Sequence, residues 1–289
     1  MRVLVTGAGG QVGRALIASA PEGCQAIAAT RSDLDITDRF AVARFCDAHR
    51  PDLIVNAAAF TAVDRAESEP ELARLVNESG AAHLAQAAAA RRARMIQLST
   101  DFVFDGQAST PYSLDASPAP LGVYGRTKLA GELAVRRSLP VASIVLRTAW
   151  VYAPRGRNFV LTMLRRMREP GTVHVVDDQR GTPTSAASVA SAVWALAGNP
   201  ELAGIHHWTD AGVASWYEFA AAIADEAAAC GLLAGPADLT PVASRDFPTA
   251  ARRPAYSVLD TRPTADAIGM TPPHWRSSLR DVLGEIAVG

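Results

Sequence analysis

Residues 1–13 read MRVLVTGAGGQVG, so a glycine-rich turn directly follows a short apolar run. The run Arg2–Thr6 predicts a strand, and a helical pattern begins at Val12. Glycine in such a turn lets the backbone bend sharply and approach a pyrophosphate, which free N–H groups at the helix start, near Gln11 and Val12, can bind. The stretch therefore predicts a dinucleotide site, with a plain tight turn as the alternative. Its GxxGxxG spacing is made by Gly7, Gly10 and Gly13.

The first half of the chain alternates apolar, β-rich runs with helical stretches. Strands that are apolar on both faces and alternate with helices predict a parallel sheet covered by helices. We therefore expect an α/β fold with a doubly wound parallel Rossmann sheet, whose ligand crevice lies at the carboxyl ends of the strands. The predicted strands are Arg2–Thr6, Gln25–Thr30, Leu53–Ala58, Met95–Ser99 and Ser143–Thr148, and the predicted helices are Val12–Ala20, Phe40–His49, Glu71–Arg91 and Tyr124–Ser138.

The second half is less regular and predicts a smaller C-terminal substrate lobe. We divide the chain into an NAD(P)-binding Rossmann domain, residues 1–154, and a mainly substrate-binding lobe, residues 155–289, with some segments returning to the Rossmann sheet. The Pro- and Ala-rich stretch Leu233–Pro254 is expected to contain turns and loops. The other predicted elements are the strands Thr172–Val176 and Ile205–Thr209 and the helices Ser185–Ala197 and Ser215–Ala229.

Composition excludes several classes of protein. The 289 residues carry a net charge of -1 at pH 7, so no basic face for a nucleic acid is predicted. No apolar stretch is long enough to cross a bilayer, and the run before Gly7 is too short for a signal peptide, so we expect a cytoplasmic protein without membrane contact. The three cysteines, Cys24, Cys46 and Cys230, are far apart and predict neither a zinc site nor a disulfide framework.

The end of the second predicted strand bears on the choice of dinucleotide. Arg31 follows this strand, and no acidic residue ends it. The usual partner of a free ribose 2′-hydroxyl is therefore missing, whereas Arg31 is placed to meet a 2′-phosphate. Asp35 and Ile36 are expected to border the adenine. The sequence favours NADPH and leaves NADH possible, and the alternative for Arg31 is a solvated surface charge.

A second motif, YxxxK, occurs at Tyr124 and Lys128. Side chains at i and i+4 share one face of a helix, so both can reach a bound cofactor. We expect the Lys128 ammonium to lower the pKa of Tyr124, which would then act as general acid for a ketone that receives hydride. A hydroxyl of Thr100 or Ser99, at the end of the preceding strand, can hold the carbonyl oxygen, and a strand-end cap is the alternative.

Longer strings carry a resemblance to a known family. They are Asn56–Asp64, Ala66–Pro70, Leu98–Gly106, Arg147–Tyr152, Asp177–Gln179, Gly181–Thr184 and Arg253–Pro254. With the two short motifs, they make the chain resemble the extended short-chain dehydrogenases, and more narrowly the dTDP-4-dehydrorhamnose reductases, over nearly its whole length. The resemblance implies that NAD(P)H delivers hydride to C4 of a dTDP-4-keto-6-deoxy-L-hexose, giving dTDP-L-rhamnose or a close relative.

The same resemblance implies roles for single residues. Thr100 would orient the carbonyl, Tyr124 would give the proton, and Lys128 would tune Tyr124 and bind the nicotinamide ribose. The ribose and phosphate side of the cofactor would contact Ala58, Ala59 and Thr61. The residues implied on the sugar-nucleotide side are Thr100, Asp101, Phe102, Trp150, Asn158, Phe159, Gln179 and Arg253, with ordinary core packing as the alternative for Trp150.

The chain departs from the family pattern at two places. Phe102 stands where many relatives have tyrosine, so no hydroxyl acts there. Some members dimerise through a magnesium ion held by glutamates, one of them just after the glycine motif, where this chain has Arg14-Ala15. We therefore predict no metal, and a monomer or weak homodimer.

Alternative functions share the scaffold. A sugar-nucleotide 4,6-dehydratase resembles this chain but uses an Asp-Glu pair where the chain has Asp101-Phe102. Another sugar-nucleotide ketoreductase of deoxysugar biosynthesis is a second possibility. A third is a non-catalytic NADP-binding regulatory subunit similar to the β subunit of methionine adenosyltransferase. The intact set of Thr100, Tyr124 and Lys128 favours an enzyme.

Overall fold

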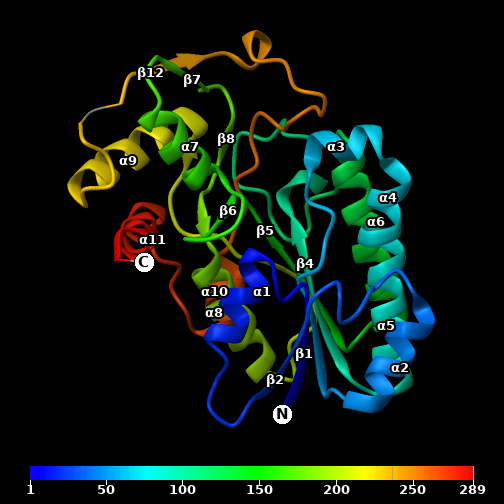
Figure 1. Ribbon diagram of the computed structural model, residues 1–289. Coiled ribbons are helices and arrows are strands. Elements are labelled where there is room, and N and C mark those ends of the chain that lie inside the picture. Colours follow the sequence, from blue (N-terminus) through cyan, green and yellow to red (C-terminus); the bar gives the residue numbers. More distant parts are fainter. Residues whose placement is uncertain (236, 289) are drawn as a thin grey trace.

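A six-stranded sheet forms the centre of the structure, a computed structural model that describes residues 1–235 and 237–288 (Figure 1). Neighbouring strands all pair in parallel, in the order β10-β5-β4-β3-β1-β2. The strand order reverses at β1 and β3, which opens a crevice at their carboxyl ends. The predicted doubly wound parallel fold is confirmed. The strands are β1 (Arg2–Thr6), β2 (Gln25–Ala29), β3 (Leu53–Asn56), β4 (Arg94–Thr100), β5 (Ser143–Thr148) and β10 (Gly204–His207).

Helices cover both faces of the sheet because its strands are apolar on both sides (Figure 1). Along β1, Val3 and Val5 belong to one apolar core and Leu4 to the other, as the period of two in a strand requires. On the Val3 side lie α1 (Gln11–Ala18), α8 (Ala186–Gly198) and α10 (Arg262–Ile268), and on the Leu4 side lie α2 (Arg39–His49), α5 (Ala81–Ala90) and α6 (Val123–Ser138).

The segment predicted as one helix, Glu71–Arg91, is interrupted. It runs as α4 (Pro70–Arg74), a π-helix η1 (Leu75–Gly80) and α5, and a further short helix, α3 (Val63–Ser68), precedes it. The wider turn places the Asn77 amide where it bonds the backbone N–H and carbonyl of Phe60. The predicted helical stretch is confirmed, and the π-turn within it, which these tertiary hydrogen bonds accompany, is a feature that periodicity does not reveal.

A second apolar core lies in the C-terminal half, where α7, α9 and α11 pack around Phe219. Ser215 and Glu218 form a capping box that begins α9. The helices are α7 (Phe159–Arg168), α9 (Trp216–Ala229) and α11 (Trp275–Val288). Three pairs of short strands accompany them: β7 (Val173–Val176) with β12 (Leu239–Val242), β6 (Val151–Tyr152) with β9 (Thr184–Ser185), and β8 (Arg180–Gly181) with β11 (Ala214–Ser215). Of the 3-10 turns, η3 (Ser244–Asp246) follows β12, and η2 (Asp101–Val103) follows β4 in the first half of the chain.

The stretch Leu233–Pro254 contains the expected turns and loops, and it also contains β12, which was not predicted. Pro241 hides this strand in the sequence, since proline lacks the N–H that a central strand needs, but β12 pairs only with β7 and so has a free edge. Pro236, within the same range, lies outside the described residues.

The sequence patterns also do not predict α7, α10 or α11. In the described ranges, none of the helices has the length and apolar character needed to cross a membrane.

Candidate active site

The turn after β1 is so closely packed that two of its glycines cannot carry a side chain. Gly7 has a φ of +66°, which favours glycine, and a Cβ there would lie 2.6 Å from the backbone nitrogen of Ala58. A Cβ on Gly13 would lie 2.2 Å from the Gly7 carbonyl oxygen. Gly10 begins α1 without a side-chain cap, so first-turn N–H groups of α1 are left to an outside acceptor. The turn therefore fits a pyrophosphate.

A pocket of about 350 Å³ opens beside this turn, at the ends of β1, β2 and β3. Its lining includes the predicted cofactor residues Gly7, Gly10, Arg31, Asp35, Ile36, Ala58 and Ala59. Val12 packs in the core and Gly13 is buried, so both shape the helix start from behind. Thr61 is exposed and is not part of this lining.

Two charged residues at the rim of this pocket differ in whether their charged group is already hydrogen-bonded within the protein. Asp35 accepts hydrogen bonds from the backbone nitrogen and hydroxyl of Thr37, at 2.9 and 2.8 Å, and these bonds hold the pKa of Asp35 below its usual value. Its carboxylate is thus engaged in its own turn. Arg31 is exposed and lines the pocket, so its guanidinium is available to a phosphate.

The three predicted catalytic residues come from neighbouring elements. Thr100 ends β4, and Tyr124 and Lys128 lie one turn apart on α6, which packs against β4. The Thr100 hydroxyl lies close enough to the Tyr124 phenol to act on its pKa. Its ring also meets that of Phe102 edge-on, with centroids 5.6 Å apart. The structure therefore brings together the hydroxyl and the phenol that the predicted roles need.

The pKa of Tyr124 shifts in the opposite direction to the expected one. Burial of the phenol raises it to about 12, the Thr100 hydroxyl partly opposes the rise, and the Asp101 charge adds to it. The expected net lowering of this pKa is wrong, because desolvation of the phenol is the largest effect and the Lys128 ammonium bonds the Leu98 carbonyl oxygen. A phenol with this pKa keeps its proton throughout the neutral range, which a proton donor requires.

Lys128 is the only lysine in the sequence, and its side chain is buried. Its Nζ donates a hydrogen bond of 2.6 Å to the carbonyl oxygen of Leu98. Desolvation lowers the pKa of Lys128 to about 8, and the Glu132 carboxylate opposes that shift. The ammonium is therefore held at a fixed place, with a pKa close to neutral.

A buried ion pair lies next to Lys128 and was missed by the sequence analysis. The Glu132 carboxylate accepts from Arg147 through Nε at 3.0 Å and Nη2 at 2.7 Å, and from the hydroxyl of Ser99. Both charged side chains are at most 2% exposed. Two signals could have found the pair: a carboxylate four residues after Lys128, and an arginine inside the apolar strand β5.

The Thr100 hydroxyl is oriented by its own surroundings. Its Oγ1 donates to Asp101 Oδ1 at 3.0 Å and accepts from the backbone nitrogen of Phe102 at 3.2 Å. Burial raises the pKa of Asp101 to about 6. The predicted substrate residues Asp101 and Phe102 therefore lie directly beside the predicted catalytic hydroxyl.

A larger pocket, of about 870 Å³, lies in the C-terminal half. Its lining includes the predicted substrate residues Phe159, Gln179 and Arg253, together with Trp216, which the sequence analysis missed. Gln179 accepts from the Trp216 indole nitrogen at 3.1 Å and donates to Ser244 at 2.8 Å. An aromatic residue in a helix usually indicates core packing, so no sequence signal selects Trp216.

Trp150 and Trp216 form a stacked pair. Their ring centroids are 3.5 Å apart and their planes differ by 5°. Trp150 has a φ of +47°, which is uncommon for a bulky residue. A Cβ on Gly181 would lie 2.5 Å from the Trp150 ring, so glycine there leaves room for the indole. The pair connects the end of β5 to the larger pocket.

Two predicted substrate residues are bound to other protein groups. Asn158 begins α7, accepts from Leu161 N at 3.0 Å and donates to Gln11 Oε1 at 2.8 Å, and it is not part of the larger pocket's lining. Arg253 binds Asp64 of α3 through both Nη atoms, at 3.0 and 2.7 Å. The Arg253 guanidinium holds the pKa of Asp64 below its usual range. This pair, also missed, ties the C-terminal segment to the Rossmann half.

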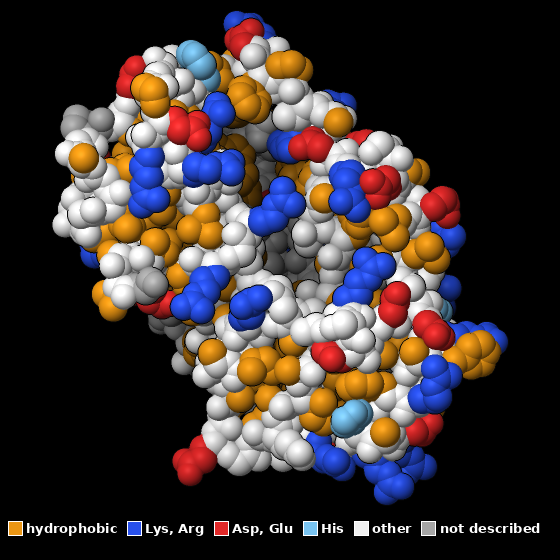
Figure 2. All heavy atoms as spheres, viewed as in Figure 1, with side chains coloured by type: hydrophobic (Ala, Val, Ile, Leu, Met, Phe, Trp, Pro, Cys, Tyr) orange, Lys and Arg blue, Asp and Glu red, His pale blue; other side chains and the backbone are white. Residues whose placement is uncertain are grey.

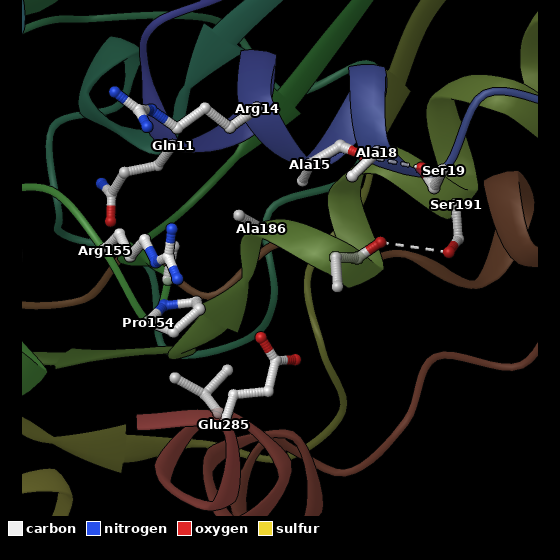
Figure 3. Close-up of a pocket in the computed structure, with 13 residues that line it drawn as sticks. Gln11, Arg14, Ala15, Ala18, Ser19, Pro154, Arg155, Ala186, Ser191 and Glu285 are labelled. Carbon is white, nitrogen blue, oxygen red and sulfur yellow. Dashed lines mark hydrogen bonds between the residues drawn. The ribbon is translucent and has the colours of Figure 1, made fainter. Parts of the chain in front are cut away.

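The surface shows where ligands can enter. Figure 2 shows a deep hollow between the two halves of the protein, with basic side chains along its rim. A third pocket, of about 500 Å³, lies between α1, α8 and α11 (Figure 3). Gln11, Arg14, Arg155 and Glu285 line it, but none of the predicted catalytic residues does.

In the described part of the chain, no three His, Cys, Asp or Glu side chains are grouped to hold a metal, and the absence of a metal stays a prediction.

A parallel Rossmann sheet with a glycine turn after its first strand, and a threonine, tyrosine and lysine set shared by β4 and α6, define an oxidoreductase of the short-chain dehydrogenase type. The family model described as "RmlD substrate binding domain" matches residues 1–288. The chain belongs to this family, that of the dTDP-4-dehydrorhamnose reductases, and the resemblance predicted from the sequence is confirmed.

Individual relatives cover nearly the whole chain. The dTDP-4-dehydrorhamnose reductase of Mycobacterium tuberculosis (strain H37Rv) is 45% identical over 289 residues, which cover 98% of this chain and 92% of that protein. A probable dTDP-4,6-dihydroxy-2-methyloxan-3-one 4-ketoreductase of Streptomyces antibioticus is 42% identical, with 99% and 96% covered. The crystal structure of the Bacillus anthracis dTDP-4-dehydrorhamnose reductase in complex with NADP superimposes with a TM-score of 0.92 at 34% identity, covering 98% of this chain and 99% of that one.

Proposed function

We propose that this protein uses NADPH to reduce the C4 ketone of a dTDP-4-keto-6-deoxy-L-hexose, converting dTDP-4-dehydro-L-rhamnose to dTDP-L-rhamnose. The joint placement of Thr100, Tyr124 and Lys128 at the carboxyl end of β4 carries the proposal, in a chain of this family. NADH remains a possible second cofactor.

The chain's own residues have distinct parts in this reaction. Bound NADPH supplies the hydride for the ketone carbon. Tyr124 donates its proton to the ketone oxygen, and Thr100, held by Asp101 and Phe102, orients that oxygen. The buried Lys128 ammonium stabilises the phenolate that remains on Tyr124 and offers a donor to the nicotinamide ribose.

The remaining site residues divide between cofactor and substrate. The residues that would hold NADPH are Gly7, Gly10, Gln11, Val12, Gly13, Arg31, Asp35, Ile36, Ala58, Ala59 and Thr61. The residues that would hold the sugar nucleotide are Asp101, Phe102, Trp150, Asn158, Phe159, Gln179 and Arg253. We accordingly propose residues 1–154 as the cofactor domain and residues 155–289 as the mainly substrate-binding lobe. In support of the division, the larger pocket is lined by residues after position 158, and β10 returns to the sheet.

One assay tests the function. The purified protein is incubated with dTDP-4-keto-6-deoxyglucose and NADPH or NADH, with and without a 3,5-epimerase, and the product is identified. We expect NADPH consumption, and dTDP-L-rhamnose only when the epimerase is present. Binding of NADPH without turnover of any dTDP-4-keto sugar would instead support the regulatory-subunit alternative.

A second candidate is a ketoreductase for a different dTDP-keto sugar. The similarity to the Streptomyces antibioticus 4-ketoreductase favours it. In the same assay, turnover without epimerase that exceeds turnover with it would support this alternative. We further propose that the protein works in the cytoplasm, without a metal ion and as a monomer or weak homodimer, which gel filtration and activity with EDTA can test.

Arg31→Ala is expected to weaken NADPH binding about tenfold and to leave NADH binding nearly unchanged. Arg31 is the exposed arginine at the pocket where a 2′-phosphate would lie, and one charge-assisted hydrogen bond is worth about 1.5–3 kcal/mol. The measurement is Kd for each cofactor by fluorescence titration. Equal losses for the two cofactors would remove Arg31 from 2′-phosphate recognition.

Arg253→Ala is expected to raise KM for the dTDP sugar about tenfold while leaving the Kd of NADPH nearly intact, since Arg253 lines the larger pocket. Asp64→Asn is the matched variant, because it weakens the same ion pair and leaves the guanidinium in place. We expect a smaller change of KM in Asp64→Asn. If the two variants raise KM alike, the ion pair itself is required and Arg253 has no direct part in substrate binding.

A further inference from the structure

We propose that Glu132 is a positioning residue for the reduction, and that its carboxylate keeps Lys128 protonated and in place behind Tyr124. The effect of Glu132 on turnover rests on the proposed function, whereas its effect on the protonation of Lys128 does not. Glu132 acts through the lysine, without touching the reacting carbonyl or Tyr124.

Contacts between α6 and β4 connect Glu132 with the proposed catalytic residues. Tyr124, Lys128 and Glu132 are spaced by four residues, which places them along one face of the helix. Three consecutive residues of β4 lie against these three side chains. The Leu98 carbonyl oxygen accepts from Lys128, the Ser99 hydroxyl donates to Glu132, and the Thr100 hydroxyl lies close enough to Tyr124 to lower its pKa. Glu132 is therefore bonded to the residue that lies between the Lys128 acceptor and Thr100.

Glu132 also affects the charge of Lys128. A buried ammonium that bonds a carbonyl oxygen is poorly solvated, and burial favours its neutral form. The Glu132 carboxylate is the nearby negative charge that opposes this effect at Lys128. Arg147 fixes the carboxylate with two hydrogen bonds and is the register partner of Ser99 across β4 and β5. The cluster of Lys128, Arg147 and Glu132 thus holds two cations and one anion, which leaves net positive charge behind Tyr124 for the developing phenolate.

Other titratable groups around α6 act in other pH ranges. Asp101, after β4, has a pKa raised by burial to about 6. His207 on β10 pairs in register with Arg147, and burial lowers its pKa to about 3, so this imidazole is neutral. Glu67 of α3 accepts a hydrogen bond from the Val123 nitrogen at the start of α6, at the opposite end of the helix face that carries Tyr124, Lys128 and Glu132. Tyr124 itself has a pKa of about 12. Loss of activity as the pH rises through about 8 therefore reports Lys128.

The sign of the expected change follows from these charges. Lys128 acts in its protonated form, so activity falls as the pH rises through its pKa. Glu132→Gln removes the negative charge that favours the protonated form, so the pKa of Lys128 falls and the alkaline limb of kcat moves to lower pH. An opposite charge at close range is worth about one pKa unit or more. Glu132→Asp keeps the charge and should return the limb toward its wild-type position.

The single lysine allows a direct measurement. Protein labelled with ¹³C-lysine gives one side-chain ε-carbon signal, and its titration by NMR reports the protonation of Lys128 without any substrate. We expect a midpoint near 8 in the wild type, a midpoint lower by about one unit or more in Glu132→Gln, and a return toward the wild type in Glu132→Asp. The pH profile of kcat should follow the same order. A folded Glu132→Gln protein with a wild-type midpoint would overturn the proposal.

Two further variants keep the test decisive. Glu132→Gln leaves the buried Arg147 charge unpaired and can prevent folding, whereas Glu132→Gln with Arg147→Gln removes both charges and should still lower the midpoint, by less. Ser99→Ala removes a hydrogen bond to Glu132 but no charge, so its midpoint should stay near the wild type. A wild-type midpoint in the double variant, or a shift in Ser99→Ala as large as in Glu132→Gln, would overturn the proposal. A wild type that titrates as expected but reduces no dTDP-4-keto sugar would disprove the proposed function alone.

Discussion

Tyr124→Phe is expected to lower kcat about a hundredfold or more while the protein still binds NADPH. The variant keeps the ring that packs edge-on against Phe102 and removes only the phenolic proton. Loss of a positioned general acid costs about 10²–10⁴ in rate. Because burial raises the pKa of Tyr124 to about 12, this group is protonated at every pH of interest. The loss should therefore be nearly the same from pH 6 to pH 8.

Tyr112→Phe is the matched control. Tyr112 also lies in the first half of the chain and loses one hydroxyl, but this hydroxyl donates to Asp105 and its ring stacks on Phe104. We expect kcat of this variant to stay within about twofold of the wild type, since no hydrogen bond joins it to the reacting groups. Stopped-flow measurement of NADPH oxidation separates binding from turnover in both proteins. Near-normal kcat in Tyr124→Phe would exclude Tyr124 as the proton donor.

The second large effect is expected at the glycine turn. Gly13→Ala should weaken NADPH binding about a hundredfold, because its Cβ would lie 2.2 Å from the Gly7 carbonyl oxygen and 2.8 Å from Ala8 Cα. Both neighbours are backbone atoms, so α1 must move away from the turn. Overpacking of this kind also costs about 1–3 kcal/mol of stability. Isothermal titration with NADPH and thermal unfolding measure the two effects.

Gly9→Ala is the control for the same turn. A Cβ on Gly9 would meet only the Thr30 side chain, at 3.8 Å, which is ordinary van der Waals contact. We expect NADPH affinity within about tenfold of the wild type and an unchanged melting temperature. If Gly9→Ala and Gly13→Ala bind NADPH equally well, close backbone approach at Gly13 is not what the cofactor site needs.

Features set by neighbours in the chain could be predicted from the sequence. The strand, glycine turn and helix at residues 2–18 follow one another directly, so their pattern sufficed to predict the turn. Tyr124 and Lys128 share a helix face for the same local reason. The family strings added Thr100, at the end of β4, and its contact with Tyr124 supports that choice.

Features that depend on tertiary packing could not be predicted. The direction of the Tyr124 pKa shift depends on burial, which the YxxxK spacing does not specify. The Glu132–Arg147 pair requires the register of β4 against β5, and Arg253 meets Asp64 across 189 residues of chain. The π-turn at Leu75–Gly80 also could not be predicted from the sequence, because its residues have ordinary helical periodicity.

The return of β10 to the sheet has a consequence for synthesis on the ribosome. Residues 143–148 form β5, but the strand that covers its outer edge is made only at residues 204–207. While the intervening chain emerges, the nascent sheet exposes an unpaired edge of backbone N–H and C=O groups, which is a template for pairing with other chains. A fragment ending at residue 154 would keep that edge permanently, so we expect it to aggregate even though it contains the complete glycine turn.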